Sequence, residues 1–208
     1  MIGLIKKMMF LAIPAAIVFS CFYPYRKKAL QAMKLKSSMQ REIGLILFVM
    51  TIFGIFAVTL WPTYYWEDTA GVWGNLRLLI DRPSFDTDLN LIPFSTVIDY
   101  VKDAIERGPI YIIDFFIHLF GNIIMFAPVG FLVSALFRNP TWKRSAIIGC
   151  GMASFIEIVQ YFIMRNTAVD DVIYNTFGCV CGYLLYLCIA KKNTRFLEKL
   201  RCVEAENE

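Results

Sequence analysis

Several side chains that can transfer protons or bind ions lie inside the apolar stretches of this 208-residue sequence. An ionisable side chain in lipid costs roughly 2.5–3.5 kcal/mol on insertion scales, so each one needs a physical reason. Asp114, His118 and Asn122 are spaced four residues apart, which places them on one face of a helix. A histidine close to a carboxylate is a pair that general-base chemistry can use.

Two further sets of residues form stripes at helical spacing: Ser154, Glu157, Gln160, Tyr161 and Arg165, and then Asp171, Asn175, Gly178 and Gly182. At a rise of 1.5 Å per residue, His118 lies about 12 Å, Glu157 about 9 Å and Asn175 about 5 Å inside the outer ends of their helices. Polar groups of three helices therefore reach a similar depth, which favours a water-accessible pocket that opens outward. The alternative is that these groups only bond one another, at roughly 0.6–2 kcal/mol per interhelical hydrogen bond. The two glycines indicate a close helix contact.

The elements that carry these stripes are membrane helices. The chain is 58% hydrophobic and only 18% charged, with a mean hydropathy of +0.56, and this composition cannot supply the charged exterior of a soluble domain. We expect an all-α integral membrane protein in which residues 1–208 form a single membrane domain. Five stretches are long enough to cross the bilayer, at about 8–25, 43–61, 110–137, 145–163 and 172–190, and an outer loop of about 48 residues joins the second to the third.

The distribution of Lys and Arg predicts the orientation. The segment between the first two stretches has six basic residues against Glu42 alone, whereas residues 62–109 have four basic residues against eight acidic ones. Because positive loops stay in the cytoplasm, we expect the N-terminus outside and the tail of residues 191–208 in the cytoplasm. A rival interpretation of the first stretch is a signal peptide, but no convincing cleavage site follows it. The basic residues lie between the apolar stretches, which argues against a nucleic-acid partner.

The order of these polar residues resembles the VanZ-like family, whose founding member is a teicoplanin-resistance protein. The resemblance covers about residues 90–183, and its pieces are Asn90-x-x-Pro93-Phe94, Asn122-x-x-x-Phe126-x-Pro128-x-Gly130, Glu157-x-x-Gln160 and Arg165-x-x-x-x-Asp170-Asp171-x-x-x-Asn175-x-x-Gly178-x-x-x-Gly182-Tyr183. Ala168 stands where the family often has another Asp, and neither His118 nor Asp114 belongs to a motif of the family. The resemblance implies lowered susceptibility to teicoplanin-type lipoglycopeptides in the membrane of a Gram-positive bacterium. It implies no reaction.

Our first hypothesis for the function is therefore a resistance factor that acts by binding. Its partners are membrane lipids and either the drug or the lipid-linked cell-wall precursor that the drug recognises. Arg165 can pair with phosphate or carboxylate, or it can form a salt bridge with Asp170 or Asp171 that shapes the outer turn. The residues expected to line the outward pocket are Asn90, Pro93, Phe94, His118, Asn122, Glu157, Gln160, Arg165, Asp170, Asp171 and Asn175.

Two other hypotheses remain open. A membrane-embedded hydrolase or transferase acting on a lipid-linked substrate would use His118 near Asp114, with Glu157 opposite. The sequence has no H-E-x-x-H or G-x-S-x-G motif and a single histidine, so we expect no catalytic metal and no cofactor. A metal site made only of Glu157, Asp170 and Asp171 is an unsupported alternative. A transporter is the third hypothesis, and no inverted repeat in the hydropathy favours it.

Overall fold

The computed structural model describes residues 2–60, 89–163, 165 and 167–204, and its regular structure is almost entirely helical. The helices are α1 (Ile2–Cys21), α2 (Tyr23–Ala32), α3 (Met39–Thr59), α4 (Ser95–Arg107), α5 (Ile110–Leu136), α6 (Trp142–Phe162), α7 (Val169–Lys192) and α8 (Thr194–Glu198). The strands are only two residues long: β1 (Leu35–Lys36), β2 (Leu89–Asn90), β3 (Thr167–Ala168) and β4 (Val203–Glu204). Residues 61–88, most of the predicted outer loop, lie outside the described residues.

Four of these helices, α3, α5, α6 and α7, are long and apolar enough to cross a membrane. α1 and α2 together supply a fifth candidate span, bent by 49° at Phe22. Pro24, in the first turn of α2, explains why a second helix begins here, because proline fits the first turn of a helix but not its interior. These spans confirm the predicted all-α membrane fold. The first helix begins earlier than predicted, at Ile2, and ends at Cys21.

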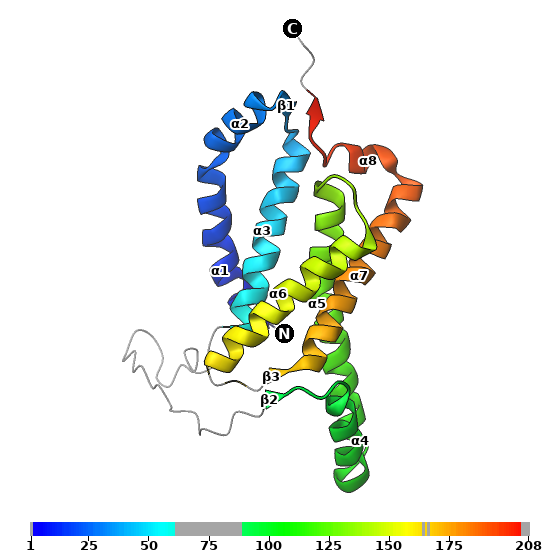
Figure 1. Cartoon of the computed structure of the whole chain (residues 1–208). Helices are drawn as coiled ribbons and strands as arrows, with labels where there is room; N and C mark the ends of the chain where they lie inside the picture. Colours follow the sequence, from blue (N-terminus) through cyan, green and yellow to red (C-terminus); the bar gives the residue numbers. More distant parts are fainter. Residues whose placement is uncertain (1, 61–88, 164, 166, 205–208) are drawn as a thin grey trace, which may run out of the picture.

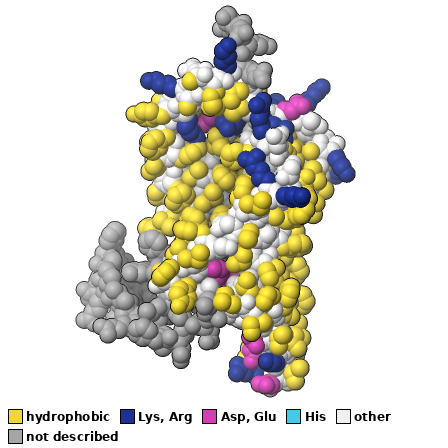
Figure 2. All heavy atoms as spheres, viewed as in Figure 1, with side chains coloured by type: hydrophobic (Ala, Val, Ile, Leu, Met, Phe, Trp, Pro, Cys, Tyr) yellow, Lys and Arg dark blue, Asp and Glu magenta, His cyan; other side chains and the backbone are white. Residues whose placement is uncertain are grey.

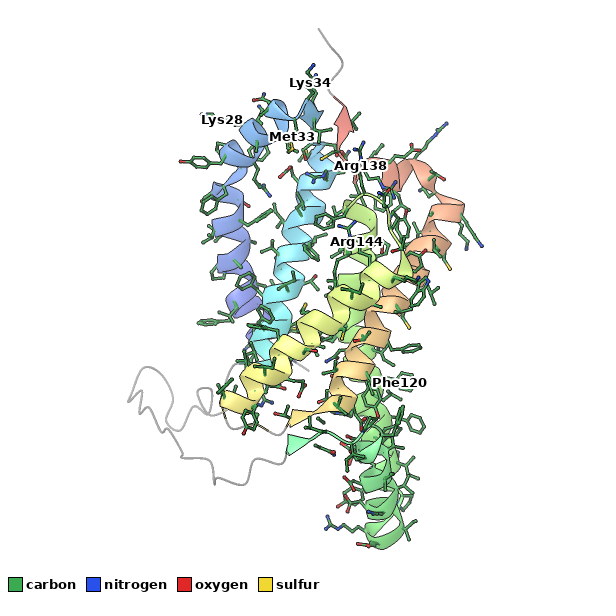
Figure 3. The ribbon with its side chains drawn as sticks, in the orientation of Figure 1. Lys28, Met33, Lys34, Phe120, Arg138 and Arg144 are labelled. Atoms are coloured by element: carbon green, nitrogen blue, oxygen red, sulfur yellow. The ribbon has the colours of Figure 1, made fainter. Side chains whose placement is uncertain are left out.

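The helices form one bundle, with the two ends of the chain toward its opposite ends (Figure 1). Hydrophobic side chains cover much of the face of the bundle that Figure 2 shows, and Lys and Arg gather at its upper end. Lys28, Lys34, Arg138 and Arg144 all lie at that end (Figure 3). Below, the upper end is called the basic end.

Local sequence signals set the helix ends at the basic end. Ser38 caps α3 by accepting the N–H of Arg41 at 3.1 Å, and Thr141 caps α6 in the same way. Glu42 in the first turn of α3 pairs with Arg26 at 2.6 Å, which ties the α1–α2 corner to α3. The antiparallel β1–β4 pair joins the C-terminal segment to the chain just before α3. The tail is therefore docked against the bundle.

The pair α5–α7 forms the centre of the bundle, and its backbones touch because the contact residues are glycines. A Cβ atom on Gly182 would lie 2.0 Å from the carbonyl oxygen of Ala127, and one on Gly130 would lie 1.9 Å from that of Cys179. A Cβ atom on Gly178 would lie 2.6 Å from the carbonyl oxygen of Ile123. This confirms the predicted close helix contact at Gly178-x-x-x-Gly182. Around it, the larger core side chains Ile55, Phe126, Val129, Val133 and Ile156 are almost fully buried.

At the end opposite the basic end, the structure adds two features to the predicted outer loop. Residues just before α5 fold into α4, a 13-residue helix that packs against the lower part of α5 (Figure 1). β2 pairs in parallel with β3, which places Asn90 beside Ala168 in the turn between α6 and α7. The segment before α4 is therefore tied to the start of α7.

The backbone contact between α5 and α7 gives a first prediction. Gly182→Ala forces a methyl group into the backbone of α5, so we expect destabilisation by roughly 1–3 kcal/mol, the usual cost of overpacking. Gly151→Ala is the matched control, because open space surrounds this helical glycine and alanine favours the helix by roughly 0.5–1 kcal/mol. Thermal unfolding in detergent measures both variants, and equal stability of the two would contradict the packing described here.

Candidate functional site

Asp170 is a buried carboxylate that holds the beginning of α4. It is fully buried, with 0% of its surface exposed. Its Oδ1 accepts the backbone N–H of Phe94 at 2.5 Å, and its Oδ2 accepts that of Thr96 at 2.9 Å. The first N–H groups of a helix have no partner within the helix, so Asp170 caps α4 from another element. Phe94 has a left-handed backbone, with φ of 65°, which turns these N–H groups toward the carboxylate.

Asp171, the next residue, bonds side chains of α5. Its Oδ1 lies 2.7 Å from Nε2 of His118 and 3.1 Å from Nδ2 of Asn122. A carboxylate only accepts hydrogen bonds, so Nε2 carries the proton and Nδ1 is the acceptor when the ring is neutral. The carboxylate partner of His118 is therefore Asp171, whereas Asp114 is exposed on α5.

Aromatic rings cover this His–Asp pair. The ring centroid of Tyr100 in α4 lies 6.3 Å from that of His118. The ring centroid of Tyr174 in α7 lies 6.4 Å from that of His118, in an edge-to-face arrangement. Burial, followed by the neighbouring carboxylates of Asp114 and Asp171, raises the pKa of Tyr100, so its phenol stays protonated. α4 thus contributes a neutral hydroxyl-bearing ring beside the pair.

Glu157 faces a different space, an open groove of about 410 Å³ beside the lower half of α6. Its Oε2 accepts the N–H of Ala168 at 3.1 Å, and the part of the chain that the structure describes holds no hydrogen-bond partner for Oε1. The groove is otherwise mainly apolar, and its lining includes Leu91, Ser154, Ile158, Tyr161, Phe162 and Val172. Glu157 is thus a single carboxylate in the wall of an apolar groove.

Arg165 and Gln160 converge on the end of α3. Nη1 of Arg165 donates to the carbonyl of Thr59 at 2.6 Å, and Nε2 of Gln160 donates to the same oxygen at 3.0 Å. The last carbonyls of a helix have no partner within it and attract positive charge, which explains this placement. Within the described ranges, Arg165 forms no ion pair with Asp170 or Asp171. The structure therefore does not contain the salt bridge in the outer turn that the sequence left open.

Three buried polar atoms on α7 have no hydrogen-bond partner among the described residues. They are the hydroxyl of Thr176, Oδ1 of Asn175 and the hydroxyl of Tyr174, and the last two belong to side chains that are 3% and 7% exposed. A buried polar atom without a partner is unusual in native proteins. Asn175 is therefore placed in the core near the site, but it does not line the groove.

The predicted residues thus form three groups and not one pocket. Asp170 with the 90–94 segment is one group, Asp171 with His118 and Asn122 is the second, and Arg165 with Gln160 at Thr59 is the third. Glu157 alone among the predicted residues lines the groove. In the described part of the chain, no cluster of three His, Cys, Asp or Glu side chains is placed to hold a metal ion.

Sequence reasoning missed the partners that belong to the backbone. The N–H groups of Phe94, Thr96 and Ala168 and the carbonyl of Thr59 have no signature in side-chain chemistry. The helix that carries Tyr100 could have been predicted, because apolar and charged residues over 95–107 recur at helical spacing.

A comparison with protein-family models matches residues 48–191, more than half of the chain, to VanZ/LLP1. The chain belongs to the VanZ/LLP1 family. The match extends from the middle of α3 to the end of α7, so it includes the carbonyl of Thr59 that Arg165 and Gln160 bond. No curated protein and no solved structure matches the chain.

The VanZ-like motifs acquire physical roles in this structure. In the motif Asn90-x-x-Pro93-Phe94, Asn90 belongs to strand β2, and the backbone N–H of Phe94 donates a hydrogen bond to Asp170. Glu157 supports the turn through Ala168, the position where the family often has Asp. The 90–94 motif, Glu157 and Asp170 thus meet around the turn between α6 and α7.

Capping by Asp170 gives a second prediction. Asp170→Ala removes both acceptors of the α4 N–H groups, and hydrogen bonds to a charged group contribute roughly 1.5–3 kcal/mol. We therefore expect faster amide hydrogen exchange at Phe94–Thr96 and through the first turn of α4. Asp99→Ala, an exposed change on the same helix, is the matched control. Unchanged exchange at the start of α4 would contradict the capping role.

The position of Arg165 gives a third prediction. Double-mutant cycles in thermal unfolding measure the energetic coupling between Arg165 and its neighbours. Arg165→Ala and Gln160→Ala should be non-additive, because both side chains share the carbonyl of Thr59. Arg165→Ala and Asp171→Asn should add to within about 0.5 kcal/mol, because their side chains bond different partners. Coupling between Arg165 and Asp171 larger than this would show that the charges interact directly.

Proposed function

We propose that this VanZ/LLP1 family protein lowers the susceptibility of a Gram-positive cell to teicoplanin-type lipoglycopeptides by binding, without catalysis. The ligand is a molecule with a lipid tail and a polar head, either the acylated drug or the lipid-linked cell-wall precursor that the drug recognises. Its site is the groove beside Glu157. The groove opens on the outside of the membrane, at the end opposite the basic end (Figure 2), in keeping with the preference of basic residues for the cytoplasm.

One observation carries the proposal: Glu157, whose Oε1 has no hydrogen-bond partner among the described residues, lies in the wall of an apolar groove. The apolar walls suit an acyl or polyprenyl chain, because they can remove its surface from water. Oε1 of Glu157 suits an ammonium, amide or hydroxyl donor of the head group, because bonds to a charged acceptor are the stronger class. The remaining N–H groups of Arg165, two residues before the groove residue Thr167, suit a phosphate or carboxylate.

A specific observation also supports the alternative of a membrane-embedded hydrolase or transferase. The His118–Asp171 pair, at 2.7 Å, has the arrangement of a general base with an orienting carboxylate. However, His118 does not line the groove, and the pair lies on the side of α7 that contacts α5. We therefore prefer binding as the function.

The susceptibility of cells that produce variants separates the two functions. Glu157→Gln keeps an acceptor for the N–H of Ala168 but removes the charge, so it should weaken ligand binding roughly tenfold and lower the tolerated drug concentration at unchanged protein level. Asp99→Asn is the control, an acid-to-amide change at an exposed position away from the groove.

His118→Ala should keep most of the tolerance if the protein acts by binding. Complete loss of tolerance with His118→Ala, in a protein that inserts and unfolds normally, would favour proton-transfer chemistry. Full tolerance with Glu157→Gln would exclude the groove carboxylate from the function.

A further inference from the structure

The hairpin formed by α4 and the first part of α5 exposes more apolar surface than water tolerates. Large side chains on α4 are exposed in a row, with Ile98 at 52%, Val101 at 47% and Ile105 at 80%. The part of α5 beside them exposes Ile112, Ile113, Phe116, Ile117 and Phe120. Phe120 points outward from α5 (Figure 3). A contiguous exposed apolar surface of this kind marks a site of contact with lipid or with another protein.

α4 is divided lengthwise into three faces. Tyr100 packs on Phe115 of α5, with ring centroids 5.7 Å apart, and defines the inner face. Ile98, Val101 and Ile105 lie within about 60° of one another around the helix axis, on the side away from Tyr100. The charged residues lie on the remaining face, where Lys102 pairs with Asp99 and Arg107 with Asp103.

The length of α5 places this hairpin at the membrane surface. α5 has 27 residues, so it is about 40 Å long at 1.5 Å per residue. The hydrocarbon core is only about 30 Å thick, so α5 exceeds it by about 10 Å. With the other end of α5 at the basic end, the excess falls on the residues that α4 packs against (Figure 1).

We propose that α4 inserts its apolar row, Ile98, Val101 and Ile105, into the lipid leaflet opposite the basic end. Three observations select lipid as the occupant. The row continues the apolar surface that α5 exposes, it lies beside the first part of a helix long and apolar enough to cross the membrane, and the charged residues of α4 lie on another face. Tyr100 packs on both Phe115 and His118, so α4 runs antiparallel to α5 and the row enters the leaflet along that helix. The inference does not rest on the proposed function.

Insertion of α4 has a consequence for the segment that precedes it. Leu91 and Ile92 are also exposed, at 66% and 69%, and Leu91 is part of the groove wall. Because the N–H of Phe94 bonds Asp170 of α7, a helix anchored in the leaflet also holds Leu91, three residues before Phe94, in place. The groove then meets the membrane where a lipid tail can enter sideways.

Spin labels at single cysteines test this proposal in the full-length protein in lipid nanodiscs. Cys21, Cys150, Cys181, Cys188 and Cys202 are first replaced by serine, and the buried Cys179 is kept. Labels are then placed at Ile98, Val101 and Ile105, with matched controls at Asp99, Lys102 and Glu106 on the same helix. Collisions with dissolved oxygen report lipid, and collisions with a water-soluble nickel chelate report water.

We expect the labels at Ile98, Val101 and Ile105 to collide severalfold more with oxygen and severalfold less with nickel than the three controls. Equal nickel accessibility of the two sets would show that the hairpin stands in water, and the proposal would be wrong. Low accessibility of the apolar row to both reagents would show that protein covers it, such as a second copy of the chain, and would also overturn the proposal. Because all six positions are exposed, the labels themselves leave the packing of the bundle intact.

Discussion

The end of the protein opposite the basic end is organised by the carboxylate of Asp170, which accepts two backbone N–H groups of α4 from the first turn of α7. A fully buried charge is tolerable only when hydrogen bonds compensate it, and here both oxygens are occupied by a helix start. Through this contact the 90–94 segment and α4 are fixed relative to α7. The groove wall at Leu91 and the ring of Tyr100 beside His118 both depend on it.

The other half of the architecture is the backbone contact between α5 and α7. Without side chains at Gly130, Gly178 and Gly182, carbonyl groups of one helix reach within van der Waals distance of the other. This close approach places Asp171, at the start of α7, within hydrogen-bond distance of His118 and Asn122 on α5. The glycines and the polar residues are therefore parts of one arrangement, since the glycines set the helix separation at which the polar side chains can meet.

The membrane class, the all-α fold and the family could be predicted from the sequence, because long apolar stretches and ordered motifs are visible in the order of the residues. The sequence was also sufficient to select Glu157, Arg165, Asp170 and Asp171 as unusual. It was not sufficient to pair them. Arg165 was expected to meet ligand or an aspartate, yet its partner is the carbonyl of Thr59 in a helix about a hundred residues earlier. Backbone acceptors and donors are the same at every position, so tertiary structure alone decides which of them a side chain reaches.

If the groove beside Glu157 receives the lipid tail of its ligand, photo-crosslinking in membranes will place that tail on the residues of the groove wall. The probes are a teicoplanin-type lipoglycopeptide and a polyprenyl-linked cell-wall precursor, each with a diazirine in its lipid tail. We expect one of them to label Ile158, Phe162 or Leu91, and Glu157→Gln to reduce this labelling. Labelling by both probes that avoids the groove, or that is the same in Glu157→Gln, would contradict it.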